Sequence, residues 1–303
     1  MPHRPPALDL YSNPAQLTAA LIDIPSVSGT EAQIADAVEA ALRATGAFTI
    51  TRDGDAVVAR TDRGLPQRVI LAGHLDTVPI ANNVPSSLRG DRLYGCGSSD
   101  MKSGVAMILH LAATITDPHY DLTLVLYDNE EVSSDRNGLG RLARNHPELL
   151  VANAAIVAEP TAGQVEAGCQ GVLRAVVHVT GRRAHAARSW LGSNAIQSAG
   201  QVLARLEQYQ ARSVTMDGCT YREGLSAVGI SGGVAGNVIP DACDVELSFR
   251  YAPDRSPADA RDHLRELFVE YDVTVRDEAP AAAPGLSAPL LQRFIEQAGV
   301  PAV

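Results

Sequence analysis

Residues Asp121–Glu131 read DLTLVLYDNEE, an apolar run that ends in two adjacent carboxylates. The run DLTLVL, Asp121–Leu126, has the length and aliphatic content of a buried strand. Glu130 and Glu131 fall just past its carboxyl end. Because open α/β sheets bind ligands at this edge, the stretch predicts both a fold class and the place of a functional site.

Strands and helices alternate through the first half of the chain. We expect strands at 69–72, 89–94, 121–127 and 154–158. Helical patterns separate them, at 15–45 (interrupted at IPSVSG), at 103–115 and near 138–146. The helix over 103–115 is apolar nearly all round, which predicts that it is buried on all sides. The order predicts an α/β fold with a mainly parallel sheet and helices on both faces.

The pattern changes near residue 170. Strand patterns at 172–180, 225–234, 243–251 and 273–275 lie among helical patterns at 195–209 and after Ser256. The order β-α-β-β-α-β predicts an α+β domain of ferredoxin-like layout, inserted into the first domain. We therefore expect a first domain over residues 1–168, the inserted domain over 169–277, and an incomplete return to the first domain over 278–303.

The composition argues against several classes of protein. The 303 residues carry a net charge of −10 and no basic stripe, so nucleic acid is not expected as a partner. The apolar runs are strand-sized and the N-terminus lacks an apolar signal segment, which predicts a cytoplasmic protein without a membrane span. The four cysteines lie far apart with no C-x-x-C pair, so we expect free thiols.

Further polar groups stand near strand ends, as Glu130 and Glu131 do. They are His74 and Asp76 in LAGHLDTVP, Asp100 between a Gly-rich loop and a helix, and Glu159 after the strand at 154–158. A His and several carboxylates that converge on one crevice cannot all be buried and ionised without a cation. Zinc accepts both nitrogen and carboxylate oxygen ligands, so the pattern predicts a zinc site.

The residue types also indicate how such a site would work. Two metal ions about 3.5–4 Å apart, bridged by one carboxylate, would absorb the charge and activate a water molecule. Of the two adjacent glutamates, one would bind metal and the other would act as general base. His74 and Asp76 point to the same side of a strand, which suits a His ligand supported by a carboxylate. Each motif alone is more often structural, but their shared position at strand ends favours a metal site.

These motifs resemble a known family. Together they are similar to the signature of metallopeptidase family M20, the di-zinc peptidases and deacylases. The matching motifs are H-x-D-T-V-P from His74, G-x-G-x-x-D-M-K ending at Lys102, E-E-x-x-S from Glu130 and E-P-T from Glu159. The resemblance implies a zinc-peptidase-like catalytic domain. It also implies that the inserted domain is a dimerisation, or lid, domain through which the protein forms a homodimer.

The resemblance implies a role for each metal ligand. His74 and Glu159 would bind one Zn²⁺, and Asp100 would bridge it to a second Zn²⁺ held by Glu131. The family carries two zinc ions per subunit, and Co²⁺ is a substitute that such a site would accept.

The resemblance implies further roles beside the metal. Glu130 would be the general base, and Asp76 would support His74. His185, in the R-A-H segment, would reach across the dimer interface to the partner's site and stabilise the oxyanion. Asn237 and Arg250 would hold the substrate, and the arginine fork suits a carboxylate.

Longer stretches, among them RAHAARSWLGSNAI and GGVAGNVIPD, resemble one branch of the family, in the form found in actinobacteria. That branch hydrolyses N-succinyl-LL-2,6-diaminopimelate to succinate and LL-2,6-diaminopimelate, a step of lysine and diaminopimelate synthesis. The negative net charge of the chain opposes such a polyanionic substrate. Zinc and arginine would therefore have to attract it locally.

The chain departs from the family pattern toward its C-terminus. In the family, the second zinc takes a His from a G-P-G…A-H segment, which a substrate-binding T-D motif precedes, and here no His follows His263. Asp100 and Glu131 would then hold the second metal with too few ligands. We therefore expect impaired turnover by this chain, from a truncated reading frame or a decayed gene copy; loss of the second site in a working protein is the third explanation.

Two other functions stay open. The same site would serve another acylated amino acid, such as acetylornithine, or a small peptide, and a substrate panel separates these. The other open function belongs to a different class of protein, a non-catalytic binding or dimerisation module. The presence of both Glu130 and His185 argues against that second reading.

Overall fold

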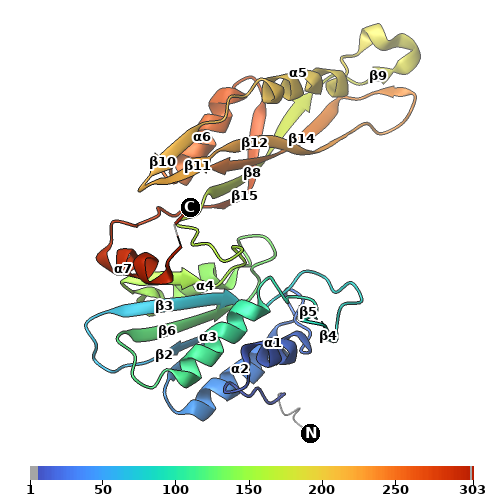
Figure 1. Cartoon of the computed structure of the whole chain (residues 1–303). Helices are drawn as coiled ribbons and strands as arrows, with labels where there is room; N and C mark the ends of the chain where they lie inside the picture. Colours follow the sequence, from blue (N-terminus) through green and yellow to red (C-terminus); the bar gives the residue numbers. More distant parts are fainter. Residues whose placement is uncertain (1–5, 301) are drawn as a thin grey trace. The chain divides into compact units, whose positions relative to one another are not determined.

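In a computed structural model of the protein, residues 6–300 and 302–303 are described, and the chain forms two compact units, Met1–Gly163 and Gln164–Val303. Each unit is built around its own sheet (Figure 1). The division into a domain over 1–168 and 278–303 with an insert over 169–277 stays a prediction.

The sheet of the first unit has five strands in the order β1-β2-β6-β3-β7. β6 (Asp121–Tyr127), β3 (Arg68–His74) and β7 (Ala154–Val157) are parallel, as the sequence predicted. β1 (Thr49–Asp53) and β2 (Ala56–Arg60) form a hairpin that runs antiparallel to β6, and the sequence analysis missed it. The sheet is therefore mixed, and its parallel part carries the candidate site residues.

Helices cover both faces of this sheet, as predicted. α1 (Pro14–Ile22), α2 (Ala32–Thr45) and α3 (Lys102–Thr114) lie on one face, and α4 (Gly138–Asn145) lies on the other (Figure 1). Alternate residues of β2 and β6 fill the two cores: Val57, Ala59, Leu124 and Leu126 on the first face, and Ala56, Val58, Val125 and Tyr127 on the second.

Two local predictions in the first unit were wrong. α3 is not buried all round, because a helix that packs on one sheet face keeps an outer side, where Met107 and Leu111 are 51% and 39% exposed. The single strand expected at 89–94 is a hairpin of β4 (Ser87–Arg89) and β5 (Arg92–Tyr94). Its turn needs the φ of 64° that Gly90 adopts, a conformation that glycine favours. A 3-10 turn, η1 (Pro147–Leu150), precedes β7.

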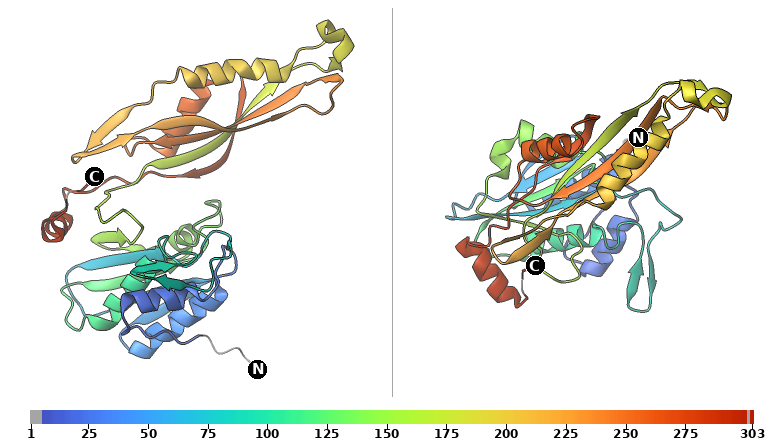
Figure 2. Two further views of the ribbon diagram at one scale, coloured as in Figure 1. Left: turned by 45° about the vertical axis from the view of Figure 1, so that its right-hand side comes forward. Right: turned by 90° about the horizontal axis from the view of Figure 1, so that it is seen from above.

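The second unit has the ferredoxin-like layout that the sequence predicted. Its antiparallel sheet has four strands, in the order β12 (Gly224–Gly232), β14 (Ala242–Tyr251), β8 (Gly171–Thr180) and β15 (Asp272–Ala279). α5 (Ala195–Glu207) and α6 (Pro257–Leu267) lie along one of its faces (Figure 2). Along β14, Val245, Leu247 and Phe249 point into this core, and the residues between them face the other way.

Smaller elements complete the second unit. They are β9 (Ala184–His185), which pairs with β13 (Val238–Ile239), the 3-10 segment η2 (Ala186–Leu191), the hairpin of β10 (Ser213–Met216) and β11 (Cys219–Arg222), and α7 (Pro289–Ala298). All four cysteines are free thiols, as expected. Within the residues that the structure describes, none of the helices has both the length and the apolar character to cross a membrane.

Candidate metal centre

The carboxyl ends of β3 and β6 lie side by side because the two strands are parallel and in register, with His74 opposite Tyr127. His74 is 1% exposed, and Asp76 is fully buried. The Nδ1 atom of His74 lies 3.0 Å from the carbonyl oxygen of Asp76 and 3.4 Å from its Oδ1. A proton on Nδ1 would bond to these oxygens and leave the lone pair of Nε2 available, which is the tautomer that a metal ligand needs.

Three carboxylates from separate connections meet at the free ring nitrogen of His74. Asp100 lies just before α3, and its Oδ1 is 3.1 Å from His74 Nε2. Glu159 follows β7, and its Oε1 is 3.8 Å from the same nitrogen. Glu131 follows β6, and ligand atoms of His74, Asp100 and Glu131 all lie within 4.8 Å of one another. The structure thus brings the four ligands expected from the sequence to one edge of the sheet.

Asp76 also holds the loop that carries the two glutamates. Its carboxylate accepts the backbone N–H groups of Glu130 and Glu131 at 2.9 and 3.1 Å, and the hydroxyl of Ser28 at 2.7 Å. Burial alone would raise the pKa of Asp76, but the hydrogen bonds, led by that from His74, lower it to about 2. Asp76 therefore stays charged. Ser28 was not predicted as a site residue, because it lies in the IPSVSG break, which the sequence pattern indicates only as a link between two helices.

The three glutamates of the centre, Glu130, Glu131 and Glu159, have raised pKa values. Burial raises the pKa of Glu130 and of Glu131, and neighbouring carboxylates add to the effect. Burial likewise raises the pKa of Glu159 to about 7, with Asp100 and Glu130 contributing. Burial would lower the pKa of His74, but the hydrogen bond and charge of Asp76, with the charge of Glu159, raise it to about 9. The cluster thus carries more negative charge than its surroundings compensate.

This donor set fits a divalent metal ion. A cation would compensate the carboxylates that now raise one another's pKa, and one ring nitrogen with carboxylate oxygens is a ligand set that zinc accepts. The Nε2 atom of His74 faces the carboxylates, as a ligand atom must. Glu130 and Glu159 both lie outside the group within 4.8 Å. Glu159 stays among the candidate ligands because its Oε1 lies 3.8 Å from His74 Nε2, which leaves Glu130 as the carboxylate available for another role.

The other expected residues lie in the second unit, at two separate places. His185 in β9 pairs with Val238 of β13, and the carbonyl oxygen of Asn237 accepts the N–H of Ala186 at 2.8 Å, so His185 and Asn237 share one exposed corner. Arg250 is exposed near the far end of β14. The strand from Ala242 to Arg250 is about 26 Å long at 3.3 Å per residue. Within one chain, the His185–Asn237 corner and Arg250 therefore lie toward opposite ends of the sheet.

The chain is similar to curated proteins of two actinobacteria. It is 60% identical over 295 residues to a protein of Mycobacterium tuberculosis that is provisionally named succinyl-diaminopimelate desuccinylase DapE, an alignment that covers 96% of this chain and 83% of that protein. It is 47% identical over 306 residues to the succinyl-diaminopimelate desuccinylase of Corynebacterium glutamicum, covering 97% of this chain and 82% of that one.

Solved structures share the fold. A tripeptidase from Staphylococcus aureus superposes with a TM-score of 0.78 at 21% identity, covering 97% of this chain and 84% of that one. The YxeP protein of Bacillus subtilis, described as a dinuclear metal binding peptidase of the M20 family, superposes with a TM-score of 0.66 at 16% identity, covering 97% and 82%. The model of peptidase family M20/M25/M40 matches residues 70–301. The chain belongs to the M20 peptidase family.

Proposed function

We propose that this protein hydrolyses the amide bond of N-succinyl-LL-2,6-diaminopimelate, giving succinate and LL-2,6-diaminopimelate. The observation that carries the proposal is the buried His74–Asp76 pair. The free ring nitrogen of His74 faces Asp100 and Glu159, and Asp76 accepts the backbone N–H of Glu130. Relatives at 60% and 47% identity that bear the desuccinylase name support the choice of substrate. A cytoplasmic location stays a prediction from the sequence.

We propose zinc as the metal, with His74, Asp100, Glu131 and Glu159 as its ligands. His74 and Glu159 would hold one ion and Glu131 a second, with Asp100 shared between them. When bound, zinc supplies a water of lowered pKa and polarises the amide carbonyl. Asp76 would keep His74 in the ligand tautomer, because its carbonyl and carboxylate oxygens face Nδ1.

Glu130 would move the proton that hydrolysis requires. Its carboxylate would accept a proton as water adds to the amide carbon and would donate it to the nitrogen that leaves as the amine. The bond from water oxygen to carbon forms, the carbon–nitrogen bond breaks, and the proton ends on the amino group of diaminopimelate. Asp76, which accepts the N–H of Glu130 at 2.9 Å, would keep the base in place.

Substrate contacts would come from the second unit. Arg250 would bind a substrate carboxylate through its two-pronged guanidinium. We propose a homodimer through this unit, in which His185 and Asn237 serve the partner's site, since within one chain they lie toward the opposite end of the sheet from Arg250. His185 would stabilise the negative oxygen of the tetrahedral intermediate.

The first prediction concerns the substrate. With zinc added, the purified chain is expected to release succinate from N-succinyl-LL-2,6-diaminopimelate with a kcat/KM at least about 100-fold above that for N-acetylornithine, because the acetyl group lacks the carboxylate of the succinyl group and leaves its hydrogen-bonding partner unpaired. Succinate release and ornithine release measure the two rates. Equal rates, or no succinate from folded, zinc-loaded protein, would contradict the proposal. A rate equal to that of the Corynebacterium glutamicum relative would show the expectation of impaired turnover to be wrong.

The second prediction concerns the metal. Replacing Asp100 by Ala is expected to lower the zinc affinity by at least about tenfold, because it removes a ligand that contacts His74 and would be shared by both ions. Equilibrium dialysis against buffered zinc, with metal analysis, measures the affinity and the number of ions bound. Asp117→Ala, at an exposed position after α3, is the matched control and should bind zinc like the parent. Equal zinc binding by Asp100→Ala would remove Asp100 from the ligand set.

A further inference from the structure

Two buried carboxylates accept backbone hydrogen bonds from the loop that carries Glu130 and Glu131. The backbone N–H of Asn129 donates to Oε1 of Glu31 at 3.1 Å. The next two N–H groups, of Glu130 and Glu131, donate to Asp76 at 2.9 and 3.1 Å. Asn129 itself has a φ of 57°, in the left-handed region that asparagine tolerates better than most residues. Three consecutive donors are therefore fixed by carboxylates that come from distant parts of the chain.

The side chain of Glu31 does not cap its own helix. It occupies the N-cap position of α2, but its side chain makes no capping hydrogen bond. It is fully buried, and among the described residues its Oε2 has no hydrogen-bond partner. Burial raises its pKa, although the N–H groups of Gly29, Glu31 and Asn129 act in the opposite direction. A buried carboxyl group with one unpaired oxygen is costly, whereas an apolar side chain would fill the same space without that cost.

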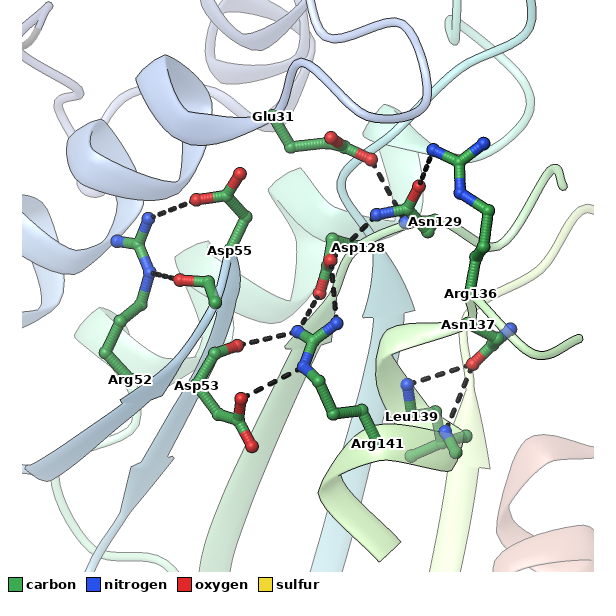
Figure 3. Close-up of polar contacts among 12 residues, drawn as sticks. Glu31, Arg52, Asp53, Asp55, Asp128, Asn129, Arg136, Asn137, Leu139 and Arg141 are labelled. Atoms are coloured by element: carbon green, nitrogen blue, oxygen red, sulfur yellow. Dashed lines mark hydrogen bonds and ion pairs between the residues drawn. The ribbon is translucent and has the colours of Figure 1, made fainter. Parts of the chain in front are cut away.

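The side chain of Asn129 is also held by hydrogen bonds, as its backbone is (Figure 3). Its Nδ2 donates to Asp128 at 2.8 Å, and its Oδ1 accepts from Arg136 at 3.1 Å. Asp128 in turn accepts from Arg141 at 2.6 Å, and Arg141 also donates to Asp53 of β1 at 2.9 Å. In Figure 3, Glu31 approaches Asn129 from the side of the sheet opposite α4. Of these contacts, the one from Glu31 holds the N–H directly before that of Glu130.

We propose that Glu31 is a positioning residue of the metal centre, which fixes the backbone of Asn129 and so sets the direction in which the side chains of Glu130 and Glu131 leave the loop. Glu31 touches neither metal nor substrate in this arrangement. It would act through its hydrogen bond to the N–H of Asn129, and a misplacement of about 1 Å at such a site costs about 100-fold in rate. The inference rests on the proposed roles of Glu130 as base and Glu131 as ligand.

The test compares a replacement that lacks an acceptor oxygen with one that keeps it. Glu31→Leu fills the space but removes the oxygen that binds Asn129, and it is expected to lower zinc affinity and kcat by about 10–100-fold each, the usual effect of losing a residue that orients a metal ligand. Glu31→Gln keeps an amide oxygen in that position and is expected to restore both toward the parent values. Asp36→Asn, at an exposed position of the same helix, is the control for general effects on α2.

Zinc affinity, measured by competition with a chromophoric chelator at a temperature where all variants are folded, separates the outcomes. A weaker affinity for Glu31→Leu, rescued in Glu31→Gln, supports the positioning role. Affinity and kcat equal to the parent in Glu31→Leu, with only a lower melting temperature, would reduce Glu31 to a structural residue and overturn the inference while leaving the proposed function intact. A parent chain that binds no zinc would overturn the proposed function and this inference with it.

Discussion

Glu130→Gln is expected to lower kcat by about 10³-fold, within the range that a positioned general base contributes. Glutamine has the size and shape of glutamate but accepts no proton at neutral pH. The backbone N–H of residue 130 still donates to Asp76, so the loop keeps its path. Glu130 is also not among the four residues proposed as zinc ligands. The variant should therefore bind substrate and zinc like the parent while losing turnover.

Glu131→Gln is the matched comparison, because it makes the same chemical change at the adjacent position. Since Glu131 belongs to the His74–Asp100 group, this variant is expected to lose zinc affinity together with rate. Steady-state kinetics and zinc binding on the same samples distinguish the two. The opposite pattern, with zinc lost in Glu130→Gln and retained in Glu131→Gln, would exchange the two roles. Full turnover by Glu130→Gln would exclude it as the base.

Glu223→Gln is expected to cost the second unit roughly 3–5 kcal/mol of unfolding free energy, the usual cost of removing one partner from a buried ion pair. The side chain of Glu223 is 0% exposed and lies 2.7 Å from Arg212 and 2.9 Å from Arg255. It also accepts the N–H of Ala252 at 3.1 Å. The glutamine leaves these two arginines without their shared carboxylate, and Arg255 is itself largely buried.

The effect of this substitution depends on pH with a definite sign. Burial alone would raise the pKa of Glu223, but the hydrogen bonds from Arg212, Ala252 and Arg255 lower it from 4.5 to about 2. A carboxyl group with a lowered folded-state pKa stabilises the fold fully above its unfolded pKa, here about 4.5, and that stabilisation disappears as the pH falls toward 2. The difference between parent and Glu223→Gln should therefore be largest near neutral pH and shrink below pH 4.5.

Hydrogen exchange of the β8, β12 and β14 amides across a urea series measures the unfolding of the second unit separately from the first. Asp254→Asn is the matched control, because Asp254 pairs with the same Arg212 but is partly exposed at 36%, so its loss should cost much less. Equal unfolding free energies for Glu223→Gln and Asp254→Asn would show that burial of Glu223 does not make the pair important.

The helices and strands with a clear hydrophobic pattern could be predicted from the sequence. The short hairpins, whose main signal is the turn between two strands, were not predicted. The apolar run Asp121–Tyr127 is β6 to the residue, because a strand buried on both faces needs a continuous apolar run. Two of the missed hairpins, β1–β2 and β10–β11, turn at an Asp-Gly pair, with Gly54 at φ 59° and Gly218 at φ 86°. Asp-Gly between short strands is a strong hairpin signal, so these two could have been found.

Some residues of the candidate site could likewise be predicted from the sequence, and others could not. His74, Asp100, Glu131 and Glu159 could be predicted because each follows, or stands beside, the end of a recognisable element. Ser28 and Glu31 could not, because their partners Asp76 and Asn129 lie 48 and 98 residues away and no local pattern links them. Only the folded arrangement shows that the link between α1 and α2 supports the metal centre.

The proposed ligands of this centre come from the ends of β3, β6 and β7 and from the start of α3, segments that are far apart along the chain. An unfolded chain does not present them together. A cation bound here would therefore bind the native state selectively and shift the folding equilibrium by mass action, by about 2.7 kcal/mol when its free concentration is 100 times its dissociation constant. Metal supply would then govern how long the first unit persists against unfolding and proteolysis, in addition to whether it can catalyse a reaction.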